Sequence, residues 1–173
     1  ISASGTDPFV NEGAPAGGPT PLFLWMTCGE RGLTAFEAGV SGTLNVLDFE
    51  PMGGALCIRN GNDVMLAVPD GPQESPLLLG AWVVQDEGGD FCLAPSSRSD
   101  MLGVVDRTYR LWEKPGVTGY SSSGSVPCRI GVNTCDADSA GPNSENLTGL
   151  RAVALEQSIE ISWATAIVLV EEG

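Results

Sequence analysis

Short apolar segments alternate with turn residues along most of this chain, in a pattern that predicts β-strands. The clearest case is Ser158–Trp163, where polar and apolar residues alternate with a period of two before the β-branched run Ala164–Val170. Alternation is typical of a strand with one buried face, and a continuous apolar run is typical of a strand buried on both faces. We therefore predict extended structure from residue 158 onward.

A β-hairpin is predicted around Asn60-Gly61-Asn62, between the apolar segments Ala55–Arg59 and Val64–Val68. Asn and Gly accept the positive φ that a tight two-residue turn requires. The other apolar runs are also short and end at turn residues: Pro21–Cys28, Thr43–Phe49, Leu77–Val84, Phe91–Leu93, Met101–Val105, Thr108–Trp112 and Val126–Val132.

Helices are poorly supported by the sequence. Leu33–Val40 and Leu150–Gln157 could each form two turns, but neither has both an N-cap and a sustained 3.6-residue period. Roughly ten to twelve short strands separated by turns are typical of a sandwich or barrel. We predict an all-β fold, an antiparallel and jelly-roll-like β-sandwich or barrel.

Residues 1–20 are predicted to form an extended N-terminal arm that precedes a single β-rich domain over residues 21–173. The arm is rich in Gly, Pro, Ala and Ser, a composition with little reason to become ordered by itself. An arm of this composition becomes ordered only where it lies against its own domain or a neighbouring chain. If the arm serves assembly by contacting a neighbouring chain, deletion of residues 1–20 should abolish assembly and leave a folded monomer.

The charge is strongly negative: 22 acidic residues face 8 basic residues, and the formal net charge is −14. Nucleic-acid binding depends on clustered Lys and Arg, yet the chain has a single lysine, Lys114, and scattered arginines. Anionic membrane surfaces are disfavoured for the same reason. No apolar run reaches the roughly 18–20 residues that cross a bilayer as a helix. The chain begins at Ile1, so we expect a processed product, a polyprotein fragment or a trimmed chain.

The five cysteines contain no CxxC pair, and no histidine is available to complete a zinc site. Cys128 and Cys135 flank a short polar stretch and are our candidates for a loop disulfide; buried free thiols are the alternative. Asn146 opens an Asn-Leu-Thr sequon and is a glycosylation candidate.

Candidate catalytic groups are few, because the absence of histidine removes the usual general base and the common nucleophile pairs. Ser121, Ser122 and Ser123 lack a partner other than Lys114, which lies in a polar turn. Paired carboxylates remain as general acid and base, with the pairs Asp48 with Glu50 and Glu156 with Glu160. Among 22 acids some pairs are close by chance, so we predict no catalytic residues and no cofactor.

Metal and sugar sites are also weakly supported. The segment from Asp136 to Gly141 begins like a calcium loop, with Asp136 and Asp138 as candidate ligands, but it lacks the later ligands of such a loop. Of the four tryptophans, only Trp112, between Arg110 and Glu113, is expected to be exposed, where it could stack on a sugar ring.

The sequence therefore favours a structural or assembly protein, an outer-layer virion subunit (capsid, protrusion or decoration) that contacts other protein subunits through its arm. It is expected at the virion exterior or extracellularly, without direct nucleic-acid contact or membrane insertion. The first alternative is a secreted binding module or pilus-type adhesin subunit that recognises carbohydrate or a receptor. The second is a carboxylate-dependent hydrolase on a β-sandwich.

Overall fold

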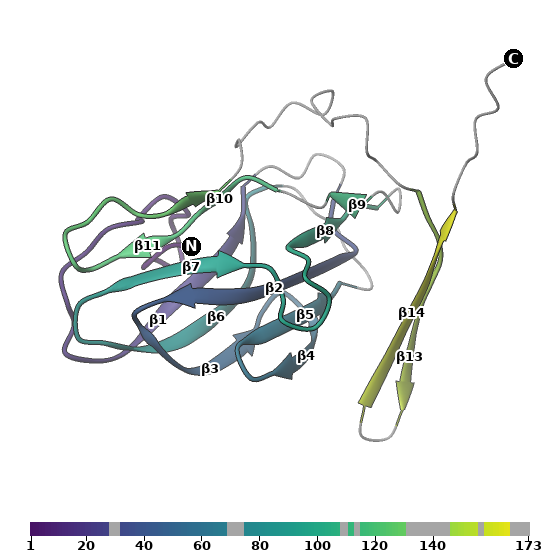
Figure 1. Cartoon of the computed structure of the whole chain (residues 1–173), viewed down its shortest axis with the longest axis horizontal. Helices are drawn as coiled ribbons and strands as arrows, with labels where there is room; N and C mark the ends of the chain where they lie inside the picture. The colour runs from purple at the N-terminus through teal and green to yellow at the C-terminus, as the bar shows by residue number, and fades with distance from the viewer. Residues whose placement is uncertain are drawn as a thin grey trace, which may run out of the picture.

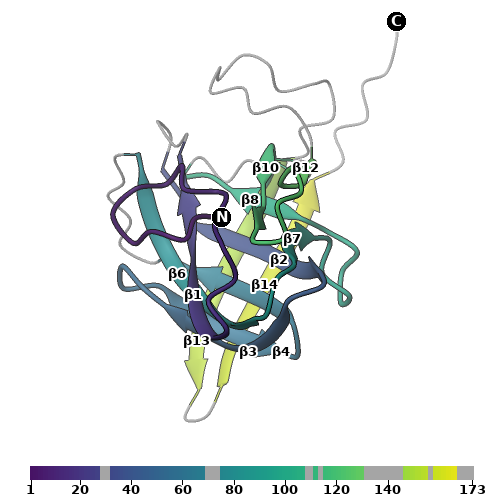
Figure 2. The ribbon, with the colours of Figure 1, turned by 90° about the vertical axis from the view of Figure 1, so that its left-hand side faces the viewer.

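The computed structural model describes residues 1–27, 32–68, 75–107, 111–112, 115–130 and, for the backbone, 146–155 and 158–166. Within these ranges the chain forms fourteen strands and no helix (Figures 1 and 2). All strand pairs are antiparallel, which confirms the predicted all-β class.

Two sheets face each other to form the main body. The first has the strand order β1–β6–β3. The second has the order β11–β7–β2–β5–β4, with β8 beside β2 and β9 beside β8. The bounds are β1 Gly18–Met26, β2 Ala35–Gly42, β3 Asn45–Pro51, β4 Leu56–Asn60, β5 Asp63–Ala67, β6 Leu77–Asp86, β7 Asp90–Ala94, β8 Gly103–Val105, β9 Leu111–Trp112 and β11 Tyr120–Ser121.

Two smaller sheets complete the described structure. Strand β10 (Val117–Thr118) pairs with β12 (Arg129–Ile130), and β13 (Asn146–Leu155) pairs with β14 (Ser158–Ala166). Neither main sheet closes on itself within the described residues, so the barrel alternative is not realised there.

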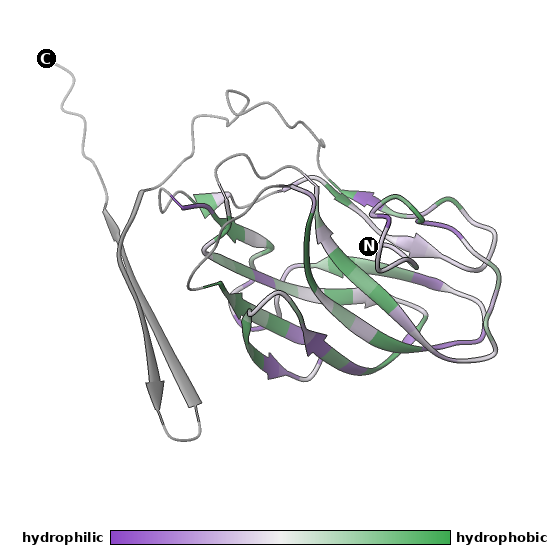
Figure 3. Ribbon diagram, turned by 180° about the vertical axis from the view of Figure 1, so that it is seen from behind, coloured by the Kyte–Doolittle hydropathy of each residue, from purple (hydrophilic) through white to green (hydrophobic). Residues whose placement is uncertain are grey.

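The core lies between the two main sheets and is centred on Trp82 of β6, whose side chain is fully buried. Its indole ring packs edge-on against Phe49 of β3, with ring centroids 4.7 Å apart. It also packs against Phe91 of β7 in the opposite sheet, at 5.3 Å. Figure 3 shows the hydrophobic positions concentrated along the strands of both sheets. Period-two alternation in the strands explains this layer, because it directs one side of each strand inward.

Two glycines permit tight chain reversals. Gly61 has a φ of 60° between β4 and β5, as the first central residue of a type II′ turn requires, and this confirms the predicted hairpin. Gly42 ends β2 with a φ of 118°, and a Cβ there would lie 2.1 Å from the carbonyl oxygen of Asp90. Only glycine fits this position without moving the backbone.

The two helical candidates are wrong. Residues 35–42 form β2, a strand that pairs with β5, β7 and β8. Residues 146–155 form β13, which pairs with β14 across the short connection at 156–157. Both segments are too short for stable helices without caps, and each has a strand partner close by in the fold.

Candidate interaction surface

The N-terminal arm lies against its own domain, and its first residues pair with β1. The amide of Ser2 donates to the carbonyl oxygen of Phe23 at 2.9 Å, and the amide of Phe23 donates back to Ser2 at 2.7 Å. Ser2 is fully buried, and the Ile1 side chain belongs to the hydrophobic core. The amino group of Ile1 donates to the Thr118 carbonyl at 2.6 Å, and burial lowers its pKa to about 6.

The arm then reaches the second sheet. The amide of Gly13 donates to the carbonyl of Ser121 at 3.0 Å, and the amide of Ser121 donates to the carbonyl of Asn11 at the same distance. Glu12 thereby forms a parallel bridge with Ser121 on β11. The arm covers one edge of each main sheet, where unpaired backbone groups would otherwise invite association. The last three residues of the predicted arm, 18–20, already belong to β1.

These contacts correct the expected result of deleting the arm. Without residues 1–20 the domain would lose Ile1 and Ser2 from its interior, the start of β1 and the pairing of two sheet edges. Deletion of the arm would therefore change folding and assembly together. Single substitutions on the outer side of the arm are the better test of assembly.

Between its two attachment points the arm forms a loop with a dense set of local hydrogen bonds. The Ser4 hydroxyl accepts from the amides of Thr6 (3.2 Å) and Asp7 (3.1 Å), and the Asp7 carboxylate accepts from the amide of Phe9 (2.9 Å). Trp25 of β1 fixes the loop to the domain by donating its indole N–H to the Ser4 carbonyl at 3.0 Å. Such Ser and Asp turns order a segment that has few apolar contacts of its own.

The side chain at the end of this ordered loop points outward. Phe9 is 72% exposed, and its neighbour Val10 is 37% exposed. Two further large apolar side chains are exposed on the segment after β11: Val126 at 82% and Ile130 at 40%. We call these four residues the assembly patch.

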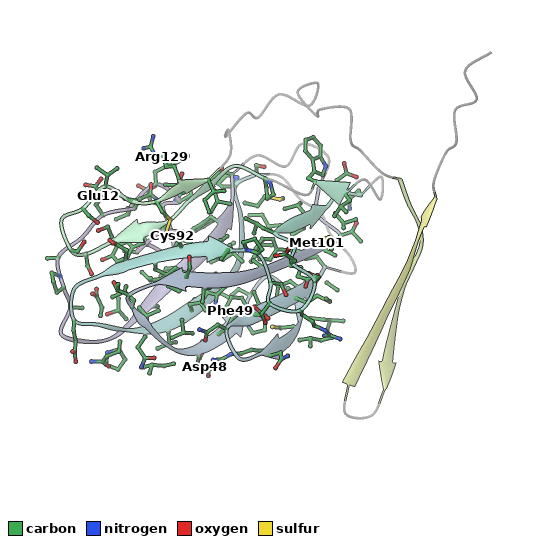
Figure 4. All side chains as sticks on the ribbon, viewed as in Figure 1. Glu12, Asp48, Phe49, Cys92, Met101 and Arg129 are labelled. Atoms are coloured by element: carbon green, nitrogen blue, oxygen red, sulfur yellow. A yellow bond between two sulfur atoms is a disulfide. The ribbon has the colours of Figure 1, made fainter. Side chains whose placement is uncertain are left out.

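Backbone pairing brings the two segments of the assembly patch to one end of the sandwich. Ile1 bonds to Thr118, Thr118 pairs with Arg129, and Ser121 pairs with the arm. Figure 4 labels Glu12 and Arg129 at this end, with Asp48 on the opposite side of the sandwich. Exposed apolar groups that gather in one region of a surface are typical of protein contact sites.

A network of serines and aspartates lies beneath the arm. Ser122 donates its hydroxyl to the buried carboxylate of Asp86 at 2.5 Å. Asp90 accepts from the hydroxyls of Ser123 at 3.0 Å and Ser125 at 2.7 Å. Hydrogen bonds from Ser125, Ser121 and Ser123 lower the pKa of Asp90. The network connects the β6–β7 turn to the segment after β11 and so supports the position of the arm.

The disulfide prediction is wrong: Cys128 is bonded to Cys92 of β7, and Cys135 lies outside the described residues. The amide of Gly119 donates to the Cys128 carbonyl at 2.9 Å, which sets residue 128 beside the β10–β11 segment, and that segment packs on β7. Cys92 and Cys128 have a sequence separation of 36, and only the fold shows that they are close in space. Cys57 is a free thiol, half-buried, and burial raises its pKa.

The candidate carboxylate pair Asp48 with Glu50 lies on β3 in an exposed position. Asp48 forms an ion pair with Arg59 of β4, which connects the two sheets on the side away from the arm. The other candidate pair, Glu156 with Glu160, cannot be placed, since residue 156 and the side chain of residue 160 lie outside the described residues.

The structure places two further carboxylates, Glu37 and Asp63, on the outer side of the second sheet. The two carboxylates line a small cavity together with Ile58, Met65 and Arg98. The cavity measures about 10 Å³, which is room for one water molecule. Ser99 donates to Glu37 at 2.7 Å, and Ser97 donates to Asp63 at 2.5 Å. We interpret them as structural carboxylates that hold the loop after β7.

The remaining candidates fall in two groups. Ser121 and Ser122 are buried within the serine–aspartate network, and the Trp112 indole N–H donates to Asp106 at 3.2 Å. Lys114, Asp136 and Asp138 lie outside the described residues, as does the side chain of Asn146, the first residue of β13. No group of three or more metal-binding side chains occurs in the part of the chain with described side chains. Nor does that part contain a helix that could cross a membrane.

Comparison with family models, with curated proteins and with solved structures found no significant match. The function therefore has to be argued from the residues themselves. Sequence reasoning missed Phe9, although its signal was present: a large aromatic residue within a Gly- and Pro-rich segment has no apolar neighbours with which to form a core.

Proposed function

We propose that this chain is a structural assembly subunit that binds other protein subunits and has no catalytic role. The observation that carries the proposal is the assembly patch, and Phe9 in particular. An aromatic side chain that is 72% exposed stands on a loop held by hydrogen bonds at both ends and within. Because the loop is ordered before contact, little conformational entropy is lost when a partner covers Phe9.

The arm has two sides in this proposal. Its inner side completes the sheets of its own domain, and its outer side, with Phe9 and Val10, is available to a neighbouring subunit. Aromatic anchors of this type contribute a large share of binding energy at protein interfaces. Val126 and Ile130 extend the apolar contact beyond the arm.

The setting that we favour is the outer layer of a virus particle, as a capsid, protrusion or decoration subunit. With 22 acidic and 8 basic residues the domain is poorly suited to contact a genome, which fits an exterior position. The chain crosses repeatedly between the two main sheets from β1 to β7, which supports a jelly-roll-like sandwich. A disulfide between Cys92 and Cys128 is consistent with the exterior of a particle.

The test is a comparison of two substitutions in the full chain, followed by sedimentation velocity over a range of concentrations. Phe9→Asp places a charge in the assembly patch and is expected to weaken association by about tenfold or more. Leu47→Asp is the matched control, because Leu47 is 44% exposed and lies on β3. Association of the Phe9 variant equal to that of the unchanged chain would contradict the proposal.

One observation favours the secreted binding module as a second candidate. The same disulfide, in a chain with many turns and polar loops, is common in secreted domains. Binding on a glycan array that disappears with Trp112→Ala would support this function, whereas a silent array would count against it.

A further inference from the structure

The turn between β4 and β5 contains the one asparagine of this chain that precedes a glycine. Asn60 is the last residue of β4, Gly61 and Asn62 form the turn, and β5 begins at Asp63. The three residues from 60 to 62 are exposed to solvent. The Asn60 side chain makes no hydrogen bond to any residue that the structure describes, so its amide is free to react.

An asparagine side chain can react with the backbone nitrogen that follows it, because the two groups close a five-membered ring; asparagine is accordingly a thermolabile residue. The Gly61 nitrogen bonds to Cγ of Asn60, the bond from Cγ to Nδ2 breaks, and the Gly61 amide hydrogen leaves with Nδ2 as ammonia. Water then opens the cyclic imide. Opening at Cγ gives aspartate, whereas opening at the backbone carbonyl carbon gives isoaspartate, in which the main chain runs through Cβ and Cγ. Water is the only other reactant.

Gly61 offers an unhindered nitrogen to this reaction. Its amide donates no hydrogen bond to another described residue, so attack on Asn60 breaks none. A Cβ at Gly61 would meet no atom within 4 Å, which means that the space beside this residue is open. The turn requires the positive φ of 60° at Gly61, and glycine adopts it most readily. The turn and the reactive pair therefore depend on the same residue.

Asn62, in the same turn, is much less suited to this reaction. It is equally exposed, but it precedes Asp63, a buried residue that pairs with Asn60 across the β4–β5 ladder. The backbone of Asp63 is held in a strand, and its side chain accepts hydrogen bonds from Ser97. The nitrogen that Asn62 would need is thus both hindered and fixed in place.

We infer that Asn60 is a site of spontaneous modification, at which Gly61 displaces ammonia and water then leaves aspartate or isoaspartate at the end of β4. Either product adds a negative charge to a chain whose formal net charge is already −14. The new charge lies beside two acidic residues, because Asn60 lines the same small cavity as Glu37 and Asp63. Like charges around one cavity repel each other. The inference is independent of the proposed assembly function.

Isoaspartate changes the turn more than aspartate does, because it inserts an additional carbon into the main chain. Arg59 connects this turn to the other main sheet: its Nε donates to the Gly61 carbonyl at 2.9 Å, and its guanidinium forms an ion pair with Asp48 of β3. A displaced Gly61 carbonyl loses the bond from Arg59. Modification to isoaspartate therefore loosens the end of the β4–β5 hairpin and its connection to β3.

The first experiment follows the full, folded chain during incubation at mildly alkaline pH, with tandem mass spectrometry of its peptides. Replacement of an amide by a carboxylate changes the mass, so conversion at Asn60 and conversion at Asn62 are measured separately in one sample. We expect Asn60 to convert about tenfold or more faster than Asn62, since glycine leaves the attacking nitrogen unhindered. Equal rates at the two residues, or conversion of Asn60 only after unfolding in urea, would overturn the inference.

Two substitutions provide matched controls for the chemistry. Asn60→Gln lengthens the side chain, so that attack by Gly61 must close a larger ring, and it should abolish conversion at this position. Asn62→Gln makes the same change at the neighbouring residue and should leave conversion at Asn60 unchanged. An Asn60→Gln chain that converts at this position as fast as the unchanged chain would contradict attack by Gly61.

The second experiment measures the consequence for the hairpin. Chromatography isolates the isoaspartate form, and hydrogen–deuterium exchange compares it with the unchanged chain. Amides of residues 59–64 should exchange about tenfold or more faster in the isoaspartate form. Asn60→Asp is the control, because it adds the same charge to an ordinary backbone, and it should keep most of the protection. Full protection in the isoaspartate form, or an equal loss in Asn60→Asp, would contradict an effect of the altered main chain.

This outcome can be separated from that of the assembly proposal. The ion pair of Arg59 with Asp48 places the turn on the side of the sandwich away from the assembly patch (Figure 4). A Phe9→Asp chain should therefore convert at Asn60 as fast as the unchanged chain. Unchanged association of the Phe9→Asp chain would contradict the assembly proposal alone, and slow conversion at Asn60 would contradict the modification site alone.

Discussion

The N-terminal arm and the C-terminal hairpin of β13 and β14 differ in a way that their sequences do not suggest. The arm is rich in glycine and proline and has no strand pattern, yet it is hydrogen-bonded to both main sheets. The hairpin contains the most regular strand pattern in the chain, yet its described strands pair only with each other. Local pattern thus predicts the conformation of a segment, but the available partners decide whether it is integrated into the domain.

This difference has a physical basis in backbone hydrogen bonding. A sheet edge presents unpaired N–H and C=O groups that accept almost any extended segment, whatever its side chains. The arm needs only small residues that approach closely, such as Ser2 beside β1 and Gly13 beside Tyr120. A hairpin already satisfies the hydrogen bonds between its two strands, so its further association depends on covering an apolar face.

The largest expected difference in the free energy of unfolding is between substitution of Trp82 in the sandwich and substitution of Trp163 in the hairpin. Trp82→Ala removes the centre of the core and should lower the free energy of unfolding of the sandwich by about 3–5 kcal/mol. Trp163→Ala changes the hairpin and should alter that free energy by less than about 1 kcal/mol in dilute solution. Urea unfolding followed by tryptophan fluorescence measures both. Equal losses would mean that the hairpin is part of the sandwich core.

Reduction of the disulfide should have the next largest effect, again confined to the sandwich. Cys92 and Cys128 close a loop across a sequence separation of 36, and the chain-entropy relation gives about 4 kcal/mol for such a loop. Cys92→Ser is expected to lower the urea midpoint accordingly. The control is Cys57→Ser, which changes a free thiol and should shift the midpoint much less. A larger effect of Cys57→Ser would contradict the described pairing.

Attachment of the arm can be tested at a glycine. A Cβ at Gly13 would lie 2.5 Å from the Tyr120 hydroxyl oxygen, so Gly13→Ala should push the arm away from β11 at a cost of about 1–2 kcal/mol. Gly18→Ala is the control, because a Cβ there meets no atom within 4 Å and its φ is not positive. Amide hydrogen exchange at residues 11–13 and 121 should accelerate in the first variant alone. Unchanged exchange would indicate that the arm is not held at this point.

The smallest expected effect concerns Asp90 and acid stability. Hydrogen bonds from serines lower the pKa of Asp90 in the folded state, so the unfolded chain binds its proton more readily. The stability that this group contributes is fully present above its usual pKa near 4, and it is lost as pH falls toward the lowered folded value. Asp90→Asn should reduce the dependence of the urea midpoint on pH below 4. A steeper dependence in the variant would contradict this sign.

Much of the fold could be predicted from the sequence because strands and turns leave local patterns. The alternating segment Ser158–Trp163 lies in strand β14 of the structure. The predicted turn at Asn60-Gly61 lies in the hairpin of β4 and β5. Pairing that joins distant residues left no such pattern, since nothing in the sequence connects Cys92 to Cys128 or Ser2 to Phe23. These contacts exist because the sheets fold them together, which only the three-dimensional arrangement reveals.

The candidate surface was predictable only in outline. The composition of residues 1–20 indicated that the arm must lie against something, and the structure identifies its own domain as that partner. Which side of the arm stays exposed depends on the turn around Ser4 and Asp7, whose hydrogen bonds involve side chains and backbone together. The Gly- and Pro-rich surroundings of Phe9 indicate an aromatic residue outside the core, but a one-dimensional pattern does not show on which side of the arm it lies.

Hydrogen–deuterium exchange as a function of protein concentration tests the central claim most directly. We predict that the arm amides of Ser2, Ala3 and Gly13 are protected at every concentration, because their acceptors belong to the same chain. Amides of β14 should be less protected than those of the arm, because the described strands of the hairpin pair only with each other. Protection of β14 equal to that of the arm, or arm protection that appears only at high concentration, would contradict the account.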